Sequence, residues 1–566
     1  MKSGKRKISS LGALIGGILL IVLINMIGQK LYHRFDLTSD RRYSLSEPTK
    51  DLLDDIDDLV YVRVYLDGDL PPSYQKLREA TKDMLNEFRA LNPNVNYEFI
   101  NPNENPDERE RRKIYTKLSK EGLQYASIKY RDGDKDAERI IFPGAIISYK
   151  GKQRPIQLLK SIMGAPEEFI INSSVQQIEY ELASNLEKLN KTIAKKIAFI
   201  EGHGEYKELE VADFAYNLEE NYEVSRLSIN GKLKSLQGLD AIIIAGPDSV
   251  FSEKDKYIID QFVMSGGKVM WFIEGAWASM DSLQDQNVTV SIPKSVNLED
   301  QLFKYGVRLN TNLILDLQAL PIPVVTGMIG NQPRQELFPW FYFPLVFPMS
   351  EHPIVKNLDG IKTEFASSLD TIGRKGIKKN ILLSSSPYSR LQSTPSRISL
   401  NLLREEPDRQ RFREGPLPIA VLLEGTFESV FNNRLPEEII DNTELKFRSS
   451  SEPTKMIVVS DANIIKNRVN WENEQYFLVG FDRYTQKQYA NKEFLMNSID
   501  YLLAESRLIE VRTKDFKMRI LDKQKVADQR TNWQIINTAG PIALISLFGL
   551  WQLWARRRRY SKKKES

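Results

Sequence analysis

The segment LDAIIIAGPDSVFSEKDKYIIDQFVMSGGKVMWFIEG at residues 239–275 has the pattern of a strand, a helix and a second strand. Its first apolar run, residues 239–247, does not alternate with polar residues, which is typical of a parallel strand buried on both faces. Ser252 is placed to cap the helix, and the Gly-Gly pair at 266–267 to end it. The second strand follows at residues 268–275. The segment therefore predicts one unit of an open α/β sheet.

The same alternation extends over residues 195–470. The apolar strand KKIAFI precedes the loop EGHGE, and a helix through Val211, Phe214 and Leu218 follows. A helix is expected at 297–306 and four more strands at 307–315, 381–386, 419–425 and 456–461. Strands alternating with helices predict a doubly wound parallel sheet, so we expect residues 195–470 to form one large α/β domain.

A smaller α/β domain is predicted at residues 45–160. The alternating strand at 58–66, the helix between Pro71 and Asn92, and the strand at 95–100 form a parallel strand–helix–strand unit. A charged helix at 107–120 and strands at 124–130, 138–142, 145–150 and 153–159 follow. This order resembles a thioredoxin-like domain without its Cys-x-x-Cys motif. A long helix within residues 161–194 is expected to link the two domains and to pack on one of them.

Composition excludes several classes of chemistry. The chain has 566 residues with no Cys and only 3 His, so disulfides, thiolate metal sites, a cysteine nucleophile and a His-rich metal centre are impossible. The net charge is +4, but the excess of Lys and Arg lies in two tails, residues 1–7 and 556–566. The body between these tails is net acidic, which argues against binding of nucleic acid.

Each basic tail adjoins an uncharged apolar run, at residues 8–29 and 531–555. Both runs are long enough to cross a bilayer, which takes about 20 helical residues. Because Lys and Arg stay on the cytoplasmic side, both termini are predicted to be cytoplasmic. The sequence thus predicts a two-pass protein of the inner membrane with a large periplasmic domain and a C-terminal helix and juxtamembrane segment at 471–530. The alternatives are a cleaved signal peptide for the first run and a buried core helix for the second.

The loop EGHGE is the first candidate site. Ligands of open parallel sheets bind beyond the carboxyl ends of the strands, where this loop is expected. Gly202 and Gly204 would allow close approach of a ligand to the backbone, and His203 with Glu201 or Glu205 could bind a polar group or transfer a proton. The alternative is a structured turn whose glycines fit the bend between strand and helix.

The run FPWFYFPLVFP at residues 338–348 is the second candidate. Its prolines forbid a regular helix, and Trp340, Phe341 and Tyr342 could form a groove for a partner or ligand, because aromatic side chains dominate interfaces. The alternative is that they pack between sheet and loop. No nucleotide-binding loop and no Gly-x-Ser-x-Gly motif is present, so no cofactor and no metal is predicted.

Five segments together resemble a known family: FDLTSDRRYSLSEPTK, VRVYLDGDLPPSYQKLREATKDMLNEFRA, KKIAFIEGHGE, FPWFYFPL and VRTKDFKMRILDKQKV. They are similar to the gliding-motility-associated ABC transporter substrate-binding proteins, GldG. The resemblance implies a membrane subunit that works with a separate ATPase and a separate polytopic permease. It also implies that the larger domain is flavodoxin-like, of the glutamine-amidotransferase type, although the chain has no cysteine to serve as the amidotransferase nucleophile.

The resemblance and the residues lead to the same functional expectation. We expect a non-catalytic, substrate-binding-like accessory subunit of an ABC transporter required for gliding motility, anchored in the lipid bilayer by two helices. The stoichiometry stays open, with a homodimer within the complex as one arrangement. Two alternatives remain at this point: an envelope hydrolase that uses the EGHGE loop, and a structural anchor of the gliding machinery without a transport role.

Overall fold

The computed structural model describes residues 16–17, 45–132, 135–160, 166–190, 195–280, 282–283, 288–329, 332–404, 406–432, 434, 447–503 and 523–561. The chain divides into two compact units, Met1–Lys514 and Asp515–Ser566, which we describe separately. The described part is a mixed α/β protein, as the sequence predicts. Apart from residues 16–17, the apolar run at 8–29 lies outside the described residues.

The smaller sheet has the strand order β2-β1-β5-β6. Strands β1 (Val60–Val64) and β2 (Val95–Phe99) are parallel and joined by helix α3 (Pro72–Leu91), which confirms the predicted strand–helix–strand unit. Strands β5 (Gly144–Tyr149) and β6 (Lys152–Gln157) pair antiparallel with each other, and β5 pairs antiparallel with β1. Strands β3 (Ala126–Asp132) and β4 (Lys135–Ile141) form a separate hairpin.

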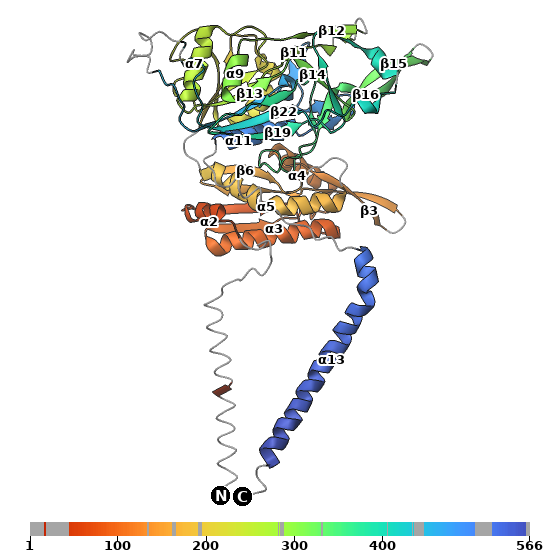
Figure 1. Cartoon of the computed structure of the whole chain (residues 1–566). Coiled ribbons are helices and arrows are strands. Elements are labelled where there is room, and N and C mark those ends of the chain that lie inside the picture. Colours follow the sequence, from red (N-terminus) through yellow and green to blue (C-terminus); the bar gives the residue numbers. More distant parts are fainter. Residues whose placement is uncertain are drawn as a thin grey trace. The chain divides into compact units, whose positions relative to one another are not determined.

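Three further helices belong to this part of the chain: α2 (Glu47–Asp54), α4 (Glu108–Lys120) and α5 (Glu167–Asn190). Helix α5 covers the predicted linking helix and begins closer to β6 than the apolar pattern indicated. Its apolar side chains share one hydrophobic core with the sheet and with α3, including Ile178, Leu182 and Leu186. Figure 1 shows α3 and α5 side by side in this layer. The helix is therefore built into the core rather than spanning a gap.

The larger sheet has seven described strands in the order β19-β22-β23-β10-β9-β7-β8. Five of them run parallel: β8 (Glu223–Ser228), β7 (Lys196–Glu201), β9 (Ala241–Ala245), β10 (Lys268–Phe272) and β23 (Thr454–Val459). Strand β22 (Pro418–Gly425) is antiparallel to both β23 and β19 (Ile377–Ser384), so the prediction of a wholly parallel sheet was wrong. The apolar run of β22 reflects burial on both faces, which does not depend on strand direction.

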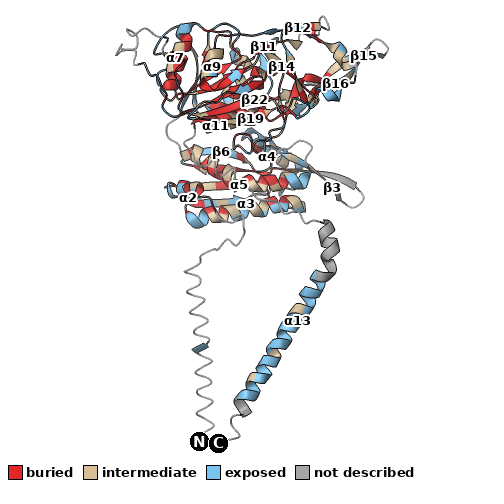
Figure 2. Ribbon diagram, viewed as in Figure 1, coloured by how far each residue is buried: buried red, intermediate tan, exposed pale blue. Residues whose placement is uncertain are grey.

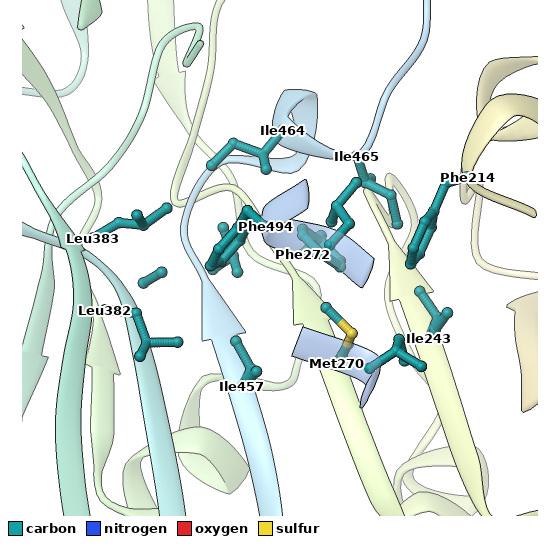
Figure 3. Close-up of a cluster of buried hydrophobic side chains, with 14 of the residues drawn as sticks. Phe214, Ile243, Met270, Phe272, Leu382, Leu383, Ile457, Ile464, Ile465 and Phe494 are labelled. Carbon is teal, nitrogen blue, oxygen red and sulfur yellow. The ribbon is translucent and has the colours of Figure 1, made fainter. Parts of the chain in front are cut away.

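Helices cover both faces of this sheet. Helices α6 (Ala212–Glu219) and α11 (Asn491–Leu503) pack on one face, and α7 (Glu253–Met264) and α9 (Glu299–Tyr305) on the other. Side chains alternate between the two cores, since Met270 and Phe272 of β10 enter the first and Trp271 the second. Figure 3 shows the first core, in which Phe214 and Phe494 share one hydrophobic cluster with Met270 and Phe272. The red strands of Figure 2 show the same burial.

Short sheets and one long hairpin are inserted between β10 and β19. The predicted strand at 307–315 is two strands in different sheets, β13 (Val307–Leu309) and β14 (Asn312–Asp316). The hairpin of β15 (Ala319–Ile329) and β16 (Gln332–Val346) contains the aromatic run. The remaining strands of this insertion are β11 (Ala276–Trp277), β12 (Val288–Pro293), β17 (Ile361–Lys362) and β18 (Leu369–Thr371). Two more strands follow β19 in the chain: β20 (Ser389–Ser393), which pairs with β14, and β21 (Ser396–Ser399), which pairs with β12.

Beyond β23 the chain forms two small hairpins, β24 (Val469–Asn470) with β25 (Gln475–Tyr476), and β26 (Phe481–Asp482) with β27 (Lys487–Gln488). The second unit contains helix α13 (Lys523–Ser561). Its segment Trp533–Arg558 is long and apolar enough to cross a membrane, and it is the one such helix among the described residues. This segment covers all but the first two residues of the run predicted at 531–555 and suggests membrane association.

Candidate functional site

The first candidate loop lies at the topological switch point of the larger sheet, where the strand order reverses. The chain leaves β7, adds β8 on one side, and then adds β9 on the other side of β7. The carboxyl ends of β7 and β9 therefore face a crevice of the kind in which open α/β sheets bind ligands. The EGHGE loop follows β7 here, and the backbone carbonyl of His203 accepts hydrogen bonds from the backbone N–H groups of Asp248 and Ser249, which follow β9.

The two glycines of the loop have a conformational reason for their positions. Gly202 and Gly204 have φ angles of 115° and 76°, in the region that favours glycine. A Cβ atom added to Gly204 would also lie only 3.0 Å from the Cβ atom of Asp248. The geometry of a tight turn therefore accounts for both residues.

The side chain of His203 is buried, with 7% of it exposed. Its Nδ1 lies 3.3 Å from Oε1 of Glu205 and its Nε2 lies 3.2 Å from Oδ2 of Asp255, on helix α7. The ring stacks on Phe251, with the ring centroids 3.7 Å apart. Glu205 also accepts a hydrogen bond from the backbone N–H of His203, at 2.7 Å. A ring with a carboxylate at each nitrogen is arranged to carry a proton on both nitrogens.

The electrostatics agree with a charged ring. Burial by itself lowers the pKa of His203, but the hydrogen bonds to Glu205 and Asp255 outweigh it, and the net pKa is raised. Asp255 has a lowered pKa: burial raises it, but a backbone N–H of Gly231, the hydroxyl of Ser252 and His203 together lower it further. A doubly protonated imidazole has no lone pair with which to act as a general base. The arrangement therefore favours a structural ion network over proton transfer.

We expect the His203→Gln variant to lose stability most at and below about pH 6.5, by about 1–3 kcal/mol for hydrogen bonds to charged groups. Because the folded pKa of His203 is raised, its contribution is complete below its ordinary pKa and is lost as pH rises through the raised value. The unfolding free energies of the wild type and the variant should thus converge in alkaline solution. The check is the guanidinium unfolding midpoint of both proteins from about pH 6.5 to pH 9.

The lower limit of that pH range avoids a second histidine. Burial lowers the pKa of His352 to about 4, so its neutral form contributes stability that is lost as pH falls below its ordinary pKa. A difference between wild type and His203→Gln that grows, rather than shrinks, with rising pH would contradict the ion network around His203.

A tyrosine side chain lies at this edge of the sheet. The ring of Tyr206 lies so close to Gly246 that a Cβ atom there would come within 2.7 Å of it. Nζ of Lys466 lies 4.5 Å from the centroid of the same ring. The Tyr206 ring therefore takes up space beside the end of β9.

The three aromatic candidates lie on β16 and are buried. Trp340, Phe341 and Tyr342 are exposed by 0%, 7% and 2%, and they pack with Leu313, Leu315 and Phe365 in a core separate from the two that flank the sheet. The hydroxyl of Tyr342 donates to Oε1 of Gln392 at 2.7 Å, and burial raises the pKa of Tyr342 to about 12. In this structure the three side chains present little surface to a partner or ligand.

A pocket of about 420 Å³ lies next to the carboxyl ends of β23 and β10. Asn463, two residues after Asp461 in the loop that follows β23, lines it, and its side-chain nitrogen lies 3.4 Å from Oε1 of Glu274, which follows β10. The other walls come from distant segments: Leu320 and Phe343 of the long hairpin, Lys362 and Glu364 near β17, and residues of the segment 466–484. No motif in the sequence predicted this pocket.

Most charges in the pocket wall are paired. Nζ of Lys362 lies 2.9 Å from Oε1 of Glu364 and 3.9 Å from Oδ1 of Asp482, and Nζ of Lys466 lies 3.0 Å from Oε1 of Glu210. Behind the wall, the carboxylate of Asp461 is fully buried and accepts hydrogen bonds from the backbone N–H groups of Glu364 and Asn463. Burial, with the nearby charge of Glu274, raises the pKa of Asp461 far above its ordinary value.

Comparison with known proteins gives the family. Residues 194–498, more than half of the chain, match the family model described as "ABC-type uncharacterized transport system". The chain belongs to this family. Residues 39–148 match a second model, a domain of unknown function named DUF7088.

Relatives of this transport-system protein add little detail. An uncharacterized protein of Borreliella burgdorferi is 25% identical over 412 residues, which cover 71% of this chain and 74% of the relative. Among solved structures, the mmIFT52 N-terminal domain is 14% identical with a TM-score of 0.31, and the match covers 54% of this chain and 97% of that domain. A score this low supports no argument about fold or function.

Membership of the transport-system family implies partners among other transporter components, and it is consistent with a role other than catalysis. Among the described residues no group of three or more His, Asp or Glu side chains is placed to hold a metal ion. The matched segment, 194–498, contains both the EGHGE loop and all the residues that line the pocket. The two features therefore lie in the part of the chain that defines the family.

Proposed function

We propose that the chain is a non-catalytic, membrane-anchored accessory subunit of an ABC transporter that works with a separate ATPase and a polytopic permease. The match of residues 194–498 to a transport-system family carries this proposal. The sequence contains no phosphate-binding loop, so another subunit has to hydrolyse ATP. Helix α13 ends in the run RRRR, whose charge favours the cytoplasmic face of a membrane.

The finer parts of the proposal rest on the sequence. The basic residues before the apolar run at 8–29 favour a second membrane helix, with both termini in the cytoplasm and the domains between them in the periplasm. The order β2-β1-β5-β6 of the smaller sheet supports a thioredoxin-like domain, and the helix-covered larger sheet supports a flavodoxin-like one. The resemblance to GldG favours a role in gliding motility.

Affinity purification from native membranes tests the role as a subunit. A tag after Ser566 should recover an ATPase with a nucleotide-binding loop and a membrane protein with several apolar spans, both far above an untagged strain. A tagged single-helix membrane protein of unrelated sequence is the control for non-specific recovery. Recovery of this chain alone, in several mild detergents, would contradict the proposal.

The predicted topology can be tested with unusual clarity because the chain has no cysteine. We expect single-cysteine variants Ser3→Cys and Ser566→Cys to react with a membrane-impermeant maleimide only after cell lysis. Tyr388→Cys, at a side chain that is 64% exposed, should react in cells whose outer membrane alone is permeabilised. The wild type, which has no cysteine, is the control for non-specific labelling. Labelling of position 3 or 566 before lysis would contradict two cytoplasmic termini.

A role in gliding is tested by deletion in a gliding host. The deletion strain should lose surface spreading, and a catalytically inactive variant of the partner ATPase should have the same defect. If the ATPase variant still glides while the deletion strain does not, the chain is a structural anchor of the machinery and the transport role is wrong.

A further inference from the structure

The segment 466–484 brings two arginines to the pocket without giving them carboxylate partners. Arg468 and Arg483 both line the pocket of about 420 Å³ beside β23. The three carboxylates of the wall, Glu210, Glu364 and Asp482, already lie near Lys466 or Lys362. Within the part of the chain that the structure describes, no carboxylate oxygen lies within 4.0 Å of either guanidinium group. The wall therefore has more positive than negative charge, and the excess is on the arginines.

Aromatic and aliphatic side chains form the rest of the wall. Trp471, Phe481 and Tyr484 come from the same segment, and Phe343 and Leu320 come from the long hairpin. The guanidinium of Arg483 lies 4.5 Å from the centroid of the Tyr484 ring, which fixes a flat cation beside a flat apolar surface. Trp471 is 56% exposed although it lines the pocket, and Nζ of Lys207 lies 5.5 Å from the centroid of its ring.

The volume of the pocket and its position in the fold both suit a small-molecule ligand. Sites for small ligands measure about 300–1,000 Å³ and combine an apolar lining with a few polar groups. The carboxyl edge of the parallel strands is the usual place for such a site. The pocket beside β23 lies near this edge, since Asn463, which lines it, follows the end of that strand. Guanidinium groups bind carboxylates and phosphates through two parallel hydrogen bonds.

We propose that this pocket binds a small organic anion, whose carboxylate or phosphate group is held by Arg468 and Arg483 and whose flat apolar part lies against Trp471. This inference goes beyond the proposed function, because it assigns a ligand site within the chain itself. It can be tested on the purified chain without any transporter partner, so that failure of one proposal is distinguishable from failure of the other.

The test is a ligand-observed NMR titration of the full-length protein in mild detergent, with empty micelles subtracted. The probes are phenyl phosphate, benzoate and the neutral benzyl alcohol, which share one flat ring. We expect saturable binding of at least one anion and at least tenfold weaker binding of the alcohol. Binding of phenyl phosphate alone would assign a phosphate ligand, and binding of benzoate alone a carboxylate ligand.

Two variants locate the binding. The double variant Arg468→Gln/Arg483→Gln should weaken binding of the anion about tenfold or more, whereas Arg409→Gln/Arg411→Gln, with the same change of charge at two other exposed arginines, should not. Trp471→Ala should weaken binding several-fold, and its exposed side chain makes misfolding of this variant no explanation. The proposal is overturned if neither anion saturates, if benzyl alcohol binds as well as the anions, or if the arginine and tryptophan variants bind like wild type.

Discussion

The Asp260→Ala variant is expected to lose about 3 kcal/mol or more of unfolding free energy. Asp260, on α7, has no exposed surface, and its carboxylate accepts hydrogen bonds from the hydroxyls of Ser429 and Tyr305, at 2.6 and 2.8 Å, and from the backbone N–H of Val430 at 3.1 Å. Alanine would leave three buried donors without an acceptor, and each costs about 1–3 kcal/mol. The three partners come from α9 and from the segment after β22, so the loss falls on the packing of α7 against these two segments.

The measurement is guanidinium unfolding of the full-length protein in mild detergent, followed by circular dichroism. Lys254→Ala is the matched control, since Lys254 is an exposed residue of the same helix, and it should change stability by no more than about 0.5 kcal/mol. Asp260→Asn, which keeps one acceptor oxygen, should lie between the control and the alanine variant. Equal stability of Asp260→Ala and wild type would show that the described hydrogen bonds do not form.

The second large effect is expected at Trp340. Its side chain has no exposed surface and lies among aliphatic and aromatic side chains of the long hairpin and of β14, so Trp340→Ala should cost about 3–5 kcal/mol. The indole nitrogen has no hydrogen-bond partner among the described residues. Trp340→Phe removes that buried N–H together with part of the ring, so its cost should be well below that of alanine.

The Trp340→Ala variant distinguishes a role of Trp340 in the hydrophobic core from a role in binding a partner. Leu337→Ala is the control on the same strand, at a side chain that is 50% exposed, and it should cost no more than about 0.5 kcal/mol. If Trp340 served to bind a partner, Trp340→Ala would keep the unfolding midpoint of wild type and lose the partners in affinity purification. Because Trp340 is buried, we expect instead that Trp340→Ala lowers the unfolding midpoint.

The sequence was sufficient to predict the strands and helices that are determined by a local pattern of apolar and capping residues. Strands β9, β10 and β23 were predicted because burial on both faces requires a continuous apolar run. The helix α7 was predicted because Ser252 caps it, and its hydroxyl indeed accepts the backbone N–H of Asp255 at 3.1 Å. The direction of β22 was not predictable, because burial gives the same pattern in both directions.

The site was harder to predict because its residues meet only after folding. The partner of His203 on α7, Asp255, is 52 residues away in the sequence. The strands of the long hairpin were missed because prolines occupy paired positions, with Pro321 opposite Pro339, and proline is rare inside strands. The predicted domain boundary after residue 470 runs through the wall of the pocket, between Arg468 and Trp471. That boundary stays a prediction, and the pocket argues for placing it later.

Photocrosslinking in intact cells tests most directly whether the chain works as a transporter subunit. A photoreactive amino acid at each of the four consecutive positions from Leu544 to Leu547 samples all sides of α13, since successive residues of a helix are about 100° apart. The account predicts that at least one position gives a light-dependent adduct with a polytopic membrane protein, and that the adduct co-purifies with an ATPase. Adducts only with this chain itself or with lipid, at all four positions, would contradict it.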